Sequence, residues 1–269
     1  MSILDRILKP RAAVETPAPP RSRLIVEDWA AMTTEQQQDY FNANGFLVIP
    51  DAVPQPLVLK IVSALEAKEG EIDELTEDFW KADSIFELVG NEKVTATLEH
   101  LFETPVKFFK AAYTRVKPVA ESKMRPGRQV LHMDYGGGEE IGDYRNSCAC
   151  WVNVAYHLTT LTEHHAPFWV VPGSHRRFNS VPTTNLDYMF DQAKMLLVNA
   201  GDALIFHCFV AHCGDANTSD STRHSFFFSH RPVWARHAGI VKEWPAEIVE
   251  NVPEPRRQVM LDLNRGLPL

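Results

Sequence analysis

Long apolar runs, cysteine and positive charge are all scarce in this chain. No apolar run approaches the roughly 18 residues that a membrane-spanning helix requires. The formal net charge is −8 at pH 7, whereas a general nucleic-acid binder needs surplus Lys and Arg to attract phosphate. No A-x-A-like cleavage site follows the short apolar patch of residues 1–11, so a secretory signal is not expected; a weak organelle-targeting segment is the alternative. We therefore expect a soluble, cytoplasmic protein that binds neither nucleic acid nor membrane.

The few cysteines also limit the class of protein. They are Cys148, Cys150, Cys208 and Cys213, and so small a number fits a reducing compartment, where buried free thiols are common. A zinc site of the form C-x-C plus C-x4-C is the alternative, but Cys148 and Cys150 lie in an alternating apolar run that is typical of a buried strand. The chain also lacks G-x-G-x-x-G and G-x-x-x-x-G-K-[ST] loops, the common signatures of nucleotide binding.

The chain is expected to form a proline-rich arm and one large domain. Three prolines within residues 17–20 disfavour regular structure, so residues 1–30 are expected to be an extended arm. Residues 31–269 are long enough for a single domain, and the chain has an ordinary 45% of hydrophobic and 23% of charged residues.

Helical patterns lie mainly within residues 33–103. The first helix is marked by Thr33 and Gln36 in capping-box spacing and by Gly45 as its stop. Apolar residues at helical spacing predict a second helix, and a third follows before Pro105. The three expected helices span residues 33–45, 56–70 and 91–103.

Strand patterns follow, mainly within residues 105–232. Short runs rich in β-branched and aromatic residues alternate with Gly, Pro and polar loops. They occupy residues 106–118, 129–135, 148–158, 168–175, 194–207 and 223–232. Helices first and strands later predict an α+β fold, in which an N-terminal helical layer supports a closed or double-layered antiparallel β core.

The sequence "QVLHMDYGGG" contains two metal-binding residue types on either side of one methionine. In a strand, side chains two residues apart share a face, so His132 and Asp134 point the same way and Met133 points the opposite way. A neutral imidazole and a carboxylate are ligands that borderline divalent metals accept. A third ligand is needed, because one H-x-D pair among 11 histidines is weak evidence alone.

The later sequence "GDALIFHCFVAHCGDANTSDSTRHS" supplies that ligand. His212 is the candidate, and Arg223 and Ser225 share a strand face further along. Two histidines and a carboxylate can hold Fe(II) on one side and leave the opposite positions open for O2 and a chelating cosubstrate. A guanidinium can bind a remote carboxylate with two parallel hydrogen bonds, and a hydroxyl can add a third donor. The dicarboxylate that meets both requirements is 2-oxoglutarate.

These motifs together resemble the phytanoyl-CoA dioxygenase family of Fe(II)/2-oxoglutarate-dependent oxygenases. The resemblance covers roughly residues 33–232 and rests on H-x-D, on P-G-S-H at residues 172–175, and on the G-D-x3-F-x5-H-x4-N-x-S-x3-R pattern at 201–223. It is strengthened by "TTEQQQDYFNANGFLVIPDAV", which is similar to the opening helix and strand of that family. The resemblance implies a double-stranded β-helix, a distorted and cupin-like jelly roll.

The resemblance also implies roles for single residues. His132, Asp134 and His212 match the metal ligands and Arg223 matches the 2-oxoglutarate clamp, with Ser225 as its partner. Tyr113 lies on a segment that the resemblance places along the cosubstrate pocket, although a core tyrosine is an equal alternative. The implied activity is hydroxylation of a small-molecule C–H bond with release of succinate and CO2. Halogenation is disfavoured, because relatives that transfer halide replace the carboxylate.

Four further residues are candidates for contact with the substrate: Tyr135, beside the carboxylate ligand; Trp151 and Asn153, which share one face of a strand; and Arg128. Arg128 belongs to a basic run between residues 105 and 132, which either attracts an anionic substrate or protects a solvated edge strand. The members of this run are Lys107, Lys110, Arg115, Lys117, Lys123, Arg125 and Arg128.

Several alternatives remain open at this point. Arg223 could pair with a surface aspartate, such as Asp202, Asp215 or Asp220. The whole protein could be a non-catalytic jelly-roll module that senses iron, 2-oxoglutarate or a small ligand, or a cofactor-independent cupin-like oxygenase. The oligomeric state and the identity of the substrate do not follow from the sequence.

Overall fold

Two antiparallel sheets form the centre of the molecule. The computed structural model describes residues 23–68, 75–76, 86–121, 127–134, 151–177, 186–235, 246–254 and 256–260. The larger sheet has the order β1-β7-β4-β9-β3-β2 and the smaller sheet the order β6-β5-β8. The strands are β1 (Phe46–Ile49), β2 (Leu75–Thr76), β3 (Val106–Val116), β4 (Val152–His157), β5 (Phe168–Val170), β6 (Lys194–Leu196), β7 (Ala203–His207), β8 (His212–Gly214) and β9 (Arg223–Pro232).

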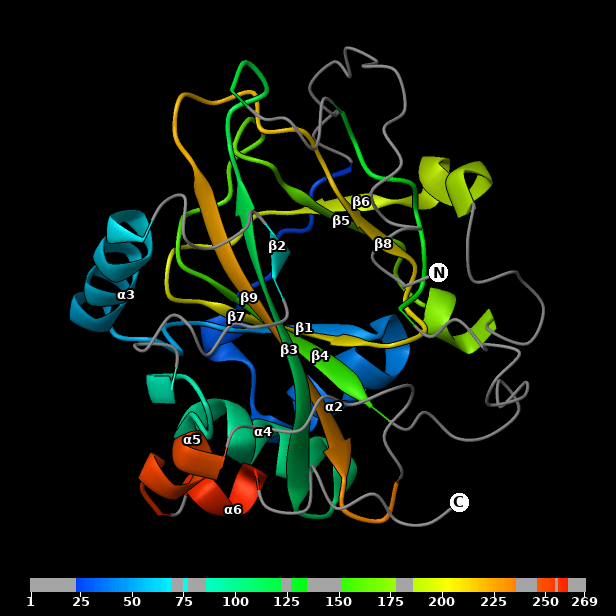
Figure 1. Ribbon diagram of the computed structural model, residues 1–269. Helices are drawn as coiled ribbons and strands as arrows, with labels where there is room; N and C mark the ends of the chain where they lie inside the picture. The colour runs from blue at the N-terminus through cyan, green and yellow to red at the C-terminus, as the bar shows by residue number, and fades with distance from the viewer. Residues whose placement is uncertain are drawn as a thin grey trace, which may run out of the picture.

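The inner faces of the two sheets pack against each other. Phe206 of the larger sheet lies 5.4 Å from Phe168 of the smaller one, measured between ring centroids. Around this pair a buried apolar cluster takes residues from both sheets, including Val48 and Leu204 from one and Val170 from the other. Neighbouring strands come from distant parts of the chain, as Figure 1 shows for β4, β7 and β9. This arrangement is a double-stranded β-helix of the jelly-roll type, so the predicted fold class is confirmed.

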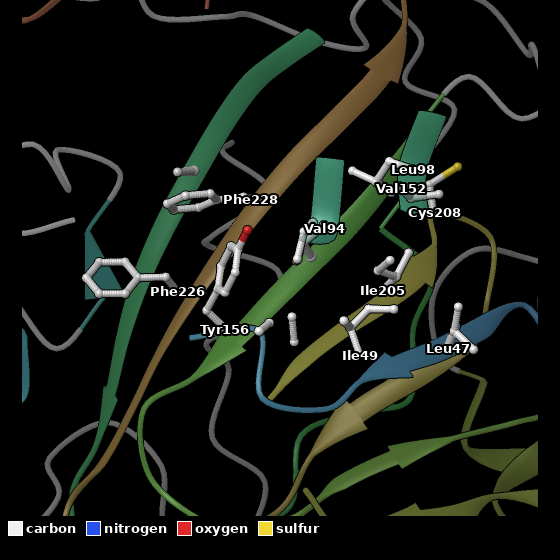
Figure 2. Packing of buried hydrophobic residues seen from close by; sticks show 14 of the residues in the cluster. Leu47, Ile49, Val94, Leu98, Val152, Tyr156, Ile205, Cys208, Phe226 and Phe228 are labelled. Atoms are coloured by element: carbon white, nitrogen blue, oxygen red, sulfur yellow. The ribbon is translucent and has the colours of Figure 1, made fainter. Parts of the chain in front are cut away.

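Helices cover the outer face of the larger sheet. The three predicted helices are present as α2 (Thr34–Asn44), α3 (Gln55–Ala67) and α4 (Glu92–Phe102). Figure 2 shows Val94 and Leu98 of α4 beside Tyr156 and Val152 of β4. Two short C-terminal helices, which the sequence did not predict, are α5 (Ala246–Asn251) and α6 (Arg256–Met260), and they lie with α4 at one end of β3 (Figure 1). Among the described residues, no helix has the length and apolar character needed to span a membrane.

The start and end of α2 illustrate how local sequence sets an element. The Thr33 side chain accepts a hydrogen bond from the Gln36 amide, and the Gln36 side chain accepts one from the Thr33 amide, which completes the predicted capping box. At the other end Gly45 has a φ of 83°, and its N–H donates to the carbonyl of Phe41. The chain then turns directly into β1.

The N-terminal segment joins the fold earlier than predicted. The arm was expected to extend through residue 30, but Leu24 forms a bridge with Met195 of β6, and Ile25 donates to the Met195 carbonyl. Trp29, in the short 3-10 helix η2 (Trp29–Ala31), packs against Tyr40 and Phe46. Residues 23–31 therefore belong to the folded domain, and residues 1–22 lie outside the described part of the chain.

Candidate metal and cosubstrate site

The segment 127–134 lies against β8 and brings two histidines together. His132 and His212 each donate their backbone N–H to the other's carbonyl, at 3.0 and 2.9 Å. Gln129 donates to Gly214 before this bridge, and Asp134 donates to Cys208 after it. The segment predicted as a strand is thus extended and hydrogen-bonded, although within residues 127–134 only the His132–His212 bridge pairs in strand fashion. Its register places His132 directly beside His212.

Three side chains converge at this bridge. One carboxylate oxygen of Asp134, Oδ1, lies 3.6 Å from Nε2 of His132 and 3.6 Å from Nε2 of His212. The three potential ligand atoms all lie within 4.8 Å of one another. The two rings are 4.6 Å apart between centroids. The structure therefore brings together the three residues that the sequence predicted as metal ligands.

Both imidazoles are prepared for metal binding through Nε2. Nδ1 of His132 lies 2.9 Å from the Val130 carbonyl, and Nδ1 of His212 lies 3.0 Å from the Val210 carbonyl. Because a carbonyl can only accept, each Nδ1 carries a proton, and Nε2 is the ring nitrogen that faces Asp134. Burial lowers the pKa of His212 to about 4, partly opposed by Asp134, so this ring is neutral at pH 7.

Asp134 is held from the other side by an amide. Burial acts to raise the pKa of Asp134, but His212, His132 and Lys110 outweigh it and lower this pKa below the ordinary value, so the carboxylate is ionised at pH 7. Its second oxygen, Oδ2, accepts a hydrogen bond from the Asn153 side chain on β4. The oxygen of that amide accepts one from the Ser229 hydroxyl on β9, at 2.6 Å.

A second polar group lies on the same inner face, nearer the start of β9. Ser225 pairs in register with Thr114 of β3 on one side and with His157 of β4 on the other. Its hydroxyl is hydrogen-bonded to Nδ1 of His157 at 3.0 Å. Arg223, two residues before Ser225, is only 2% exposed, and its Nη1 donates to the Ala166 carbonyl at 2.6 Å. The alternative of a surface ion pair with an aspartate therefore does not describe Arg223.

In this second group, the Thr114 hydroxyl and Nε2 of His157 are buried atoms without a hydrogen-bond partner in the structure. Burial, followed by the nearby charge of Arg223, moves the pKa of His157 well below its ordinary value, so the ring is neutral. Buried polar groups are normally hydrogen-bonded, and unpaired ones beside a buried cation are what a pocket for a polar, anionic ligand requires.

Tyr113 does not lie with Arg223 and Ser225. It pairs in register with Phe226, so its side chain points to the opposite face of the sheet. There it is 1% exposed and its hydroxyl is hydrogen-bonded to Nδ1 of His224 at 2.7 Å. This corrects the expectation that Tyr113 lines the cosubstrate pocket, and the alternative of a core tyrosine describes its position.

Arg128 is also turned away from the interior. Its Nη1 donates to Asp187 and lies 3.6 Å from Sγ of Cys213, whose side chain is on the face of β8 opposite to His212. The guanidinium covers the ring of Phe190, which belongs to η7 (Leu186–Gln192). Arg128 thus links the segment 127–134 to η7. This placement does not support the predicted contact with substrate.

The other substrate candidates have different outcomes. Trp151 is buried next to β4, edge-on to Phe109, and its indole N–H has no hydrogen-bond partner in the structure. Asn153 contacts the site through its hydrogen bond to Asp134, and the oxygen of its amide accepts a hydrogen bond from Ser229. Tyr135 lies outside the described residues. Substrate contact by Trp151, Asn153 and Tyr135 stays a prediction.

Three residues of the interior were not singled out from the sequence: Thr114, His157 and Ser229. Lys110 was named only as a member of the basic run. Face alternation could have found His157, which is four residues after Asn153, and Ser229, which is four after Ser225. Thr114 and Lys110 become visible only through the pairing of β3 with β9.

A jelly roll whose interior holds two histidines and a carboxylate, with a buried arginine further along, defines the class of protein. The sequence model of the phytanoyl-CoA dioxygenase (PhyH) family matches residues 41–225, and the chain belongs to this family. The matched range contains all three clustered side chains and ends at Ser225. Among curated proteins, no sequence matches the chain significantly.

Solved structures share the fold at low sequence identity. The epimerase SnoN of nogalamycin biosynthesis, in complex with Fe3+, α-ketoglutarate and nogalamycin RO, aligns with a TM-score of 0.62 and 15% identity over 77% of this chain and 87% of that one. The carbocyclase SnoK aligns with a TM-score of 0.60 and 18% identity, over 76% and 85%. HygX from Streptomyces hygroscopicus, with nickel and 2-oxoglutarate bound, aligns with a TM-score of 0.60 and 20% identity, over 76% and 88%.

Proposed function

We propose that the protein is an Fe(II)/2-oxoglutarate-dependent oxygenase that hydroxylates a C–H bond of a small molecule and releases succinate and CO2. The observation that carries this proposal is the convergence of two Nε2 lone pairs and one carboxylate oxygen inside the barrel. Membership of the phytanoyl-CoA dioxygenase family supports it. So do the structural neighbours SnoN, which was crystallised with iron and α-ketoglutarate, and HygX, with nickel and 2-oxoglutarate.

The side chains fit a divalent metal. His132, Asp134 and His212 would hold the ion, because two neutral imidazoles and one carboxylate are the donor set that leaves three positions of Fe(II) open on one side. Phe168 and Phe206 lie against the His212 ring, at 5.3 and 4.7 Å between centroids, and exclude water from that side. The orientation of the His212 ring is therefore fixed by this packing and by the hydrogen bond from its Nδ1 to the Val210 carbonyl.

The second polar group fits 2-oxoglutarate. Arg223 would bind the remote carboxylate and Ser225 would donate to it while accepting from Nδ1 of His157, and the unpaired Thr114 hydroxyl can add a further donor. Iron and 2-oxoglutarate together supply the oxidising power toward O2 that no protein side chain has. The tasks of this chain are to bind and orient both groups and to keep water from the buried end of the pocket.

Hydroxylation is the proposed reaction, although proteins with this fold catalyse several different reactions. SnoN is an epimerase and SnoK a carbocyclase, so related structures direct the same cofactors to different products. Asp134 occupies a position that a halide would need for transfer, so the intact carboxylate favours hydroxylation over halogenation. A non-catalytic sensor would use the same ligands but would not turn over 2-oxoglutarate.

The proposed substrate is anionic, and Lys110 is the observation that favours this. Lys110 pairs in register with Ser229, whose hydroxyl donates to Asn153 beside Asp134. It contributes to lowering the pKa of Asp134, so its ammonium lies near the metal site. Two other members of the basic run are less suited to this role, because Arg115 is buried and Arg128 is turned outward. Lys123 and Arg125 lie outside the described residues. A carboxylate or phosphate on the substrate would pair with Lys110.

Anaerobic absorbance tests the proposed cofactors. Metal-stripped protein is titrated with Fe(II) and then with 2-oxoglutarate, beside His212→Ala and Arg223→Ala. We expect a visible charge-transfer band that needs both components, is lost in His212→Ala and needs more 2-oxoglutarate in Arg223→Ala. A folded wild-type protein without the band would contradict the proposal. Slow succinate formation in air without substrate then separates an enzyme from a sensor.

A further inference from the structure

The two oxygens of Asp134 have different surroundings. Oδ1 faces both histidines at equal distances of 3.6 Å, whereas Oδ2 accepts the hydrogen bond from Asn153. Asn153 is 6% exposed, and Ser229, which contacts its other end, is 5% exposed. The carboxylate is therefore oriented by a buried network as well as by its own strand segment.

Only one orientation of the amide satisfies this network. A metal-bound carboxylate can only accept hydrogen bonds, so the NH2 group of Asn153 must face Asp134. The amide oxygen then faces Ser229, whose hydroxyl must donate, and this agrees with the 2.6 Å contact. The Asp134 carboxylate thus sets the orientation of the amide, and Ser229 holds the other end of Asn153 in place.

The network is set by strand register. Asn153 of β4 pairs with Ser229 of β9 on one side and with Phe206 of β7 on the other. Phe206 packs on the ring of His212. Ser229, Asn153 and Phe206 thus form one row across the larger sheet. Through Asn153 this row contacts Asp134, and through Phe206 it contacts His212.

We propose that Asn153, held by Ser229, is a positioning residue that keeps Asp134 a ligand through one oxygen. This inference rests on the metal site of the proposed function. A carboxylate that can rotate is able to bind a metal through both oxygens, which would occupy one of the three positions that 2-oxoglutarate and O2 need. By holding Oδ2, the amide leaves Oδ1 for the metal and those three positions open.

Cobalt binding tests the inference without relying on turnover. Metal-stripped wild type, Asn153→Ala, Ser229→Ala and Ser229→Thr are titrated with Co(II), and the visible spectrum reports both affinity and coordination. Loss of a residue that orients a metal ligand typically weakens metal binding about 10–100-fold, which is the loss expected for Asn153→Ala, with an altered spectrum. Ser229→Ala should show a smaller change of the same kind, and Ser229→Thr, which keeps the hydroxyl, should behave as wild type.

Asn217→Ala is the matched control. Asn217 is a fully buried asparagine whose side chain donates to the carbonyls of Val116 and Ser221, so its loss lowers stability without touching Asp134. It should leave the cobalt affinity and spectrum unchanged. If Asn153→Ala does not fold, as judged by circular dichroism, the comparison of Ser229→Ala with Ser229→Thr tests the inference instead. Equal cobalt affinities and spectra in these two variants would then overturn it.

The outcomes separate this inference from the proposed function. Wild-type protein that does not bind Co(II) would overturn the metal site and this inference together. Wild-type binding with an unchanged affinity and spectrum in a folded Asn153→Ala protein would overturn this inference alone. An equal change in Asn217→Ala would do the same, because it would show a general loss of packing.

Discussion

At the scale of single residues, a substitution of Arg223 can distinguish cosubstrate binding from metal binding. We predict that Arg223→Lys raises the KM for 2-oxoglutarate about 10–100-fold, because an ammonium keeps the charge but cannot form two parallel bonds while contacting the Ala166 carbonyl. Binding of Co(II) should not change. Succinate formation at varied 2-oxoglutarate measures this, with Arg177→Lys, on the exposed Arg177–Gln192 contact, as the control. An unchanged KM would contradict the assignment.

Lys110 gives a second prediction at this scale, about the charge of the substrate. Candidate acids and their methyl esters are compared in pairs for their stimulation of succinate formation. Lys110→Ala should lower kcat/KM for an acid about tenfold, the value of one charged hydrogen bond, and should leave its neutral ester unaffected. Lys60→Ala removes an exposed charge paired with Glu87 on the outside of the barrel and is the control. Equal losses for acid and ester would rule out ion pairing.

At the scale of elements, two glycine turns position the strands that carry the site, and they differ in what a side chain would meet. Gly201, before β7, has a φ of 97°, and an added Cβ would lie 2.5 Å from the Val53 carbonyl oxygen. Gly173, after β5, has a φ of 73°, but its nearest contact would be 3.4 Å. We predict that Gly173→Ala costs about 1–2 kcal/mol of unfolding free energy from backbone strain, and that Gly201→Ala costs clearly more. Urea denaturation measures both, and equal costs would contradict the predicted clash.

The elements also show where the sequence was informative. The helix α2 could be predicted because its signals, Thr33, Gln36 and Gly45, act within one or two turns of the chain. The face of Tyr113 could not, because β9 is buried along nearly its whole length and shows no alternation that fixes its partners. The register of β3 with β9, set by packing across the sheet, turned Tyr113 outward and Lys110 inward.

At the scale of the whole molecule, the site combines what is close in sequence with what only the fold joins. His132 and Asp134 could be recognised as a pair from their spacing, and His212 and Arg223 from the motif around them. Their supports were only partly accessible: Asn153 was predicted as a substrate contact, but its role beside Asp134 depends on Asn153, Ser229 and Phe206 lying on three strands that meet only in the folded sheet. The clustering of His132, Asp134 and His212 was therefore predictable, whereas the contacts that hold them required the structure.

Buried neutral histidines link the stability of the whole molecule to pH. Burial lowers the pKa of His212 to about 4, partly opposed by Asp134, and that of His230 to about 4, slightly opposed by the Phe228 carbonyl. The pKa of His157 is also well below the ordinary value, because of burial and Arg223. The unfolded chain takes up these protons near pH 6.5, whereas folded His212 and His230 take them up only near pH 4. Their stabilising contribution is therefore complete above pH 6.5 and is lost as the pH falls toward 4.

We therefore predict that the Tm of the metal-free protein falls steeply between pH 6.5 and 4, with each such histidine contributing up to about 1.4 kcal/mol per pH unit. His230→Phe tests this, because His230 lies on the outer face, 5.5 Å from the ring of Phe108, and takes no part in the metal site. The variant removes one proton-binding group and keeps an aromatic ring, so its Tm should depend less on pH than that of the wild type. Thermal melts from pH 8 to 4.5 provide the measurement, and parallel curves for the two proteins would show that His230 does not contribute.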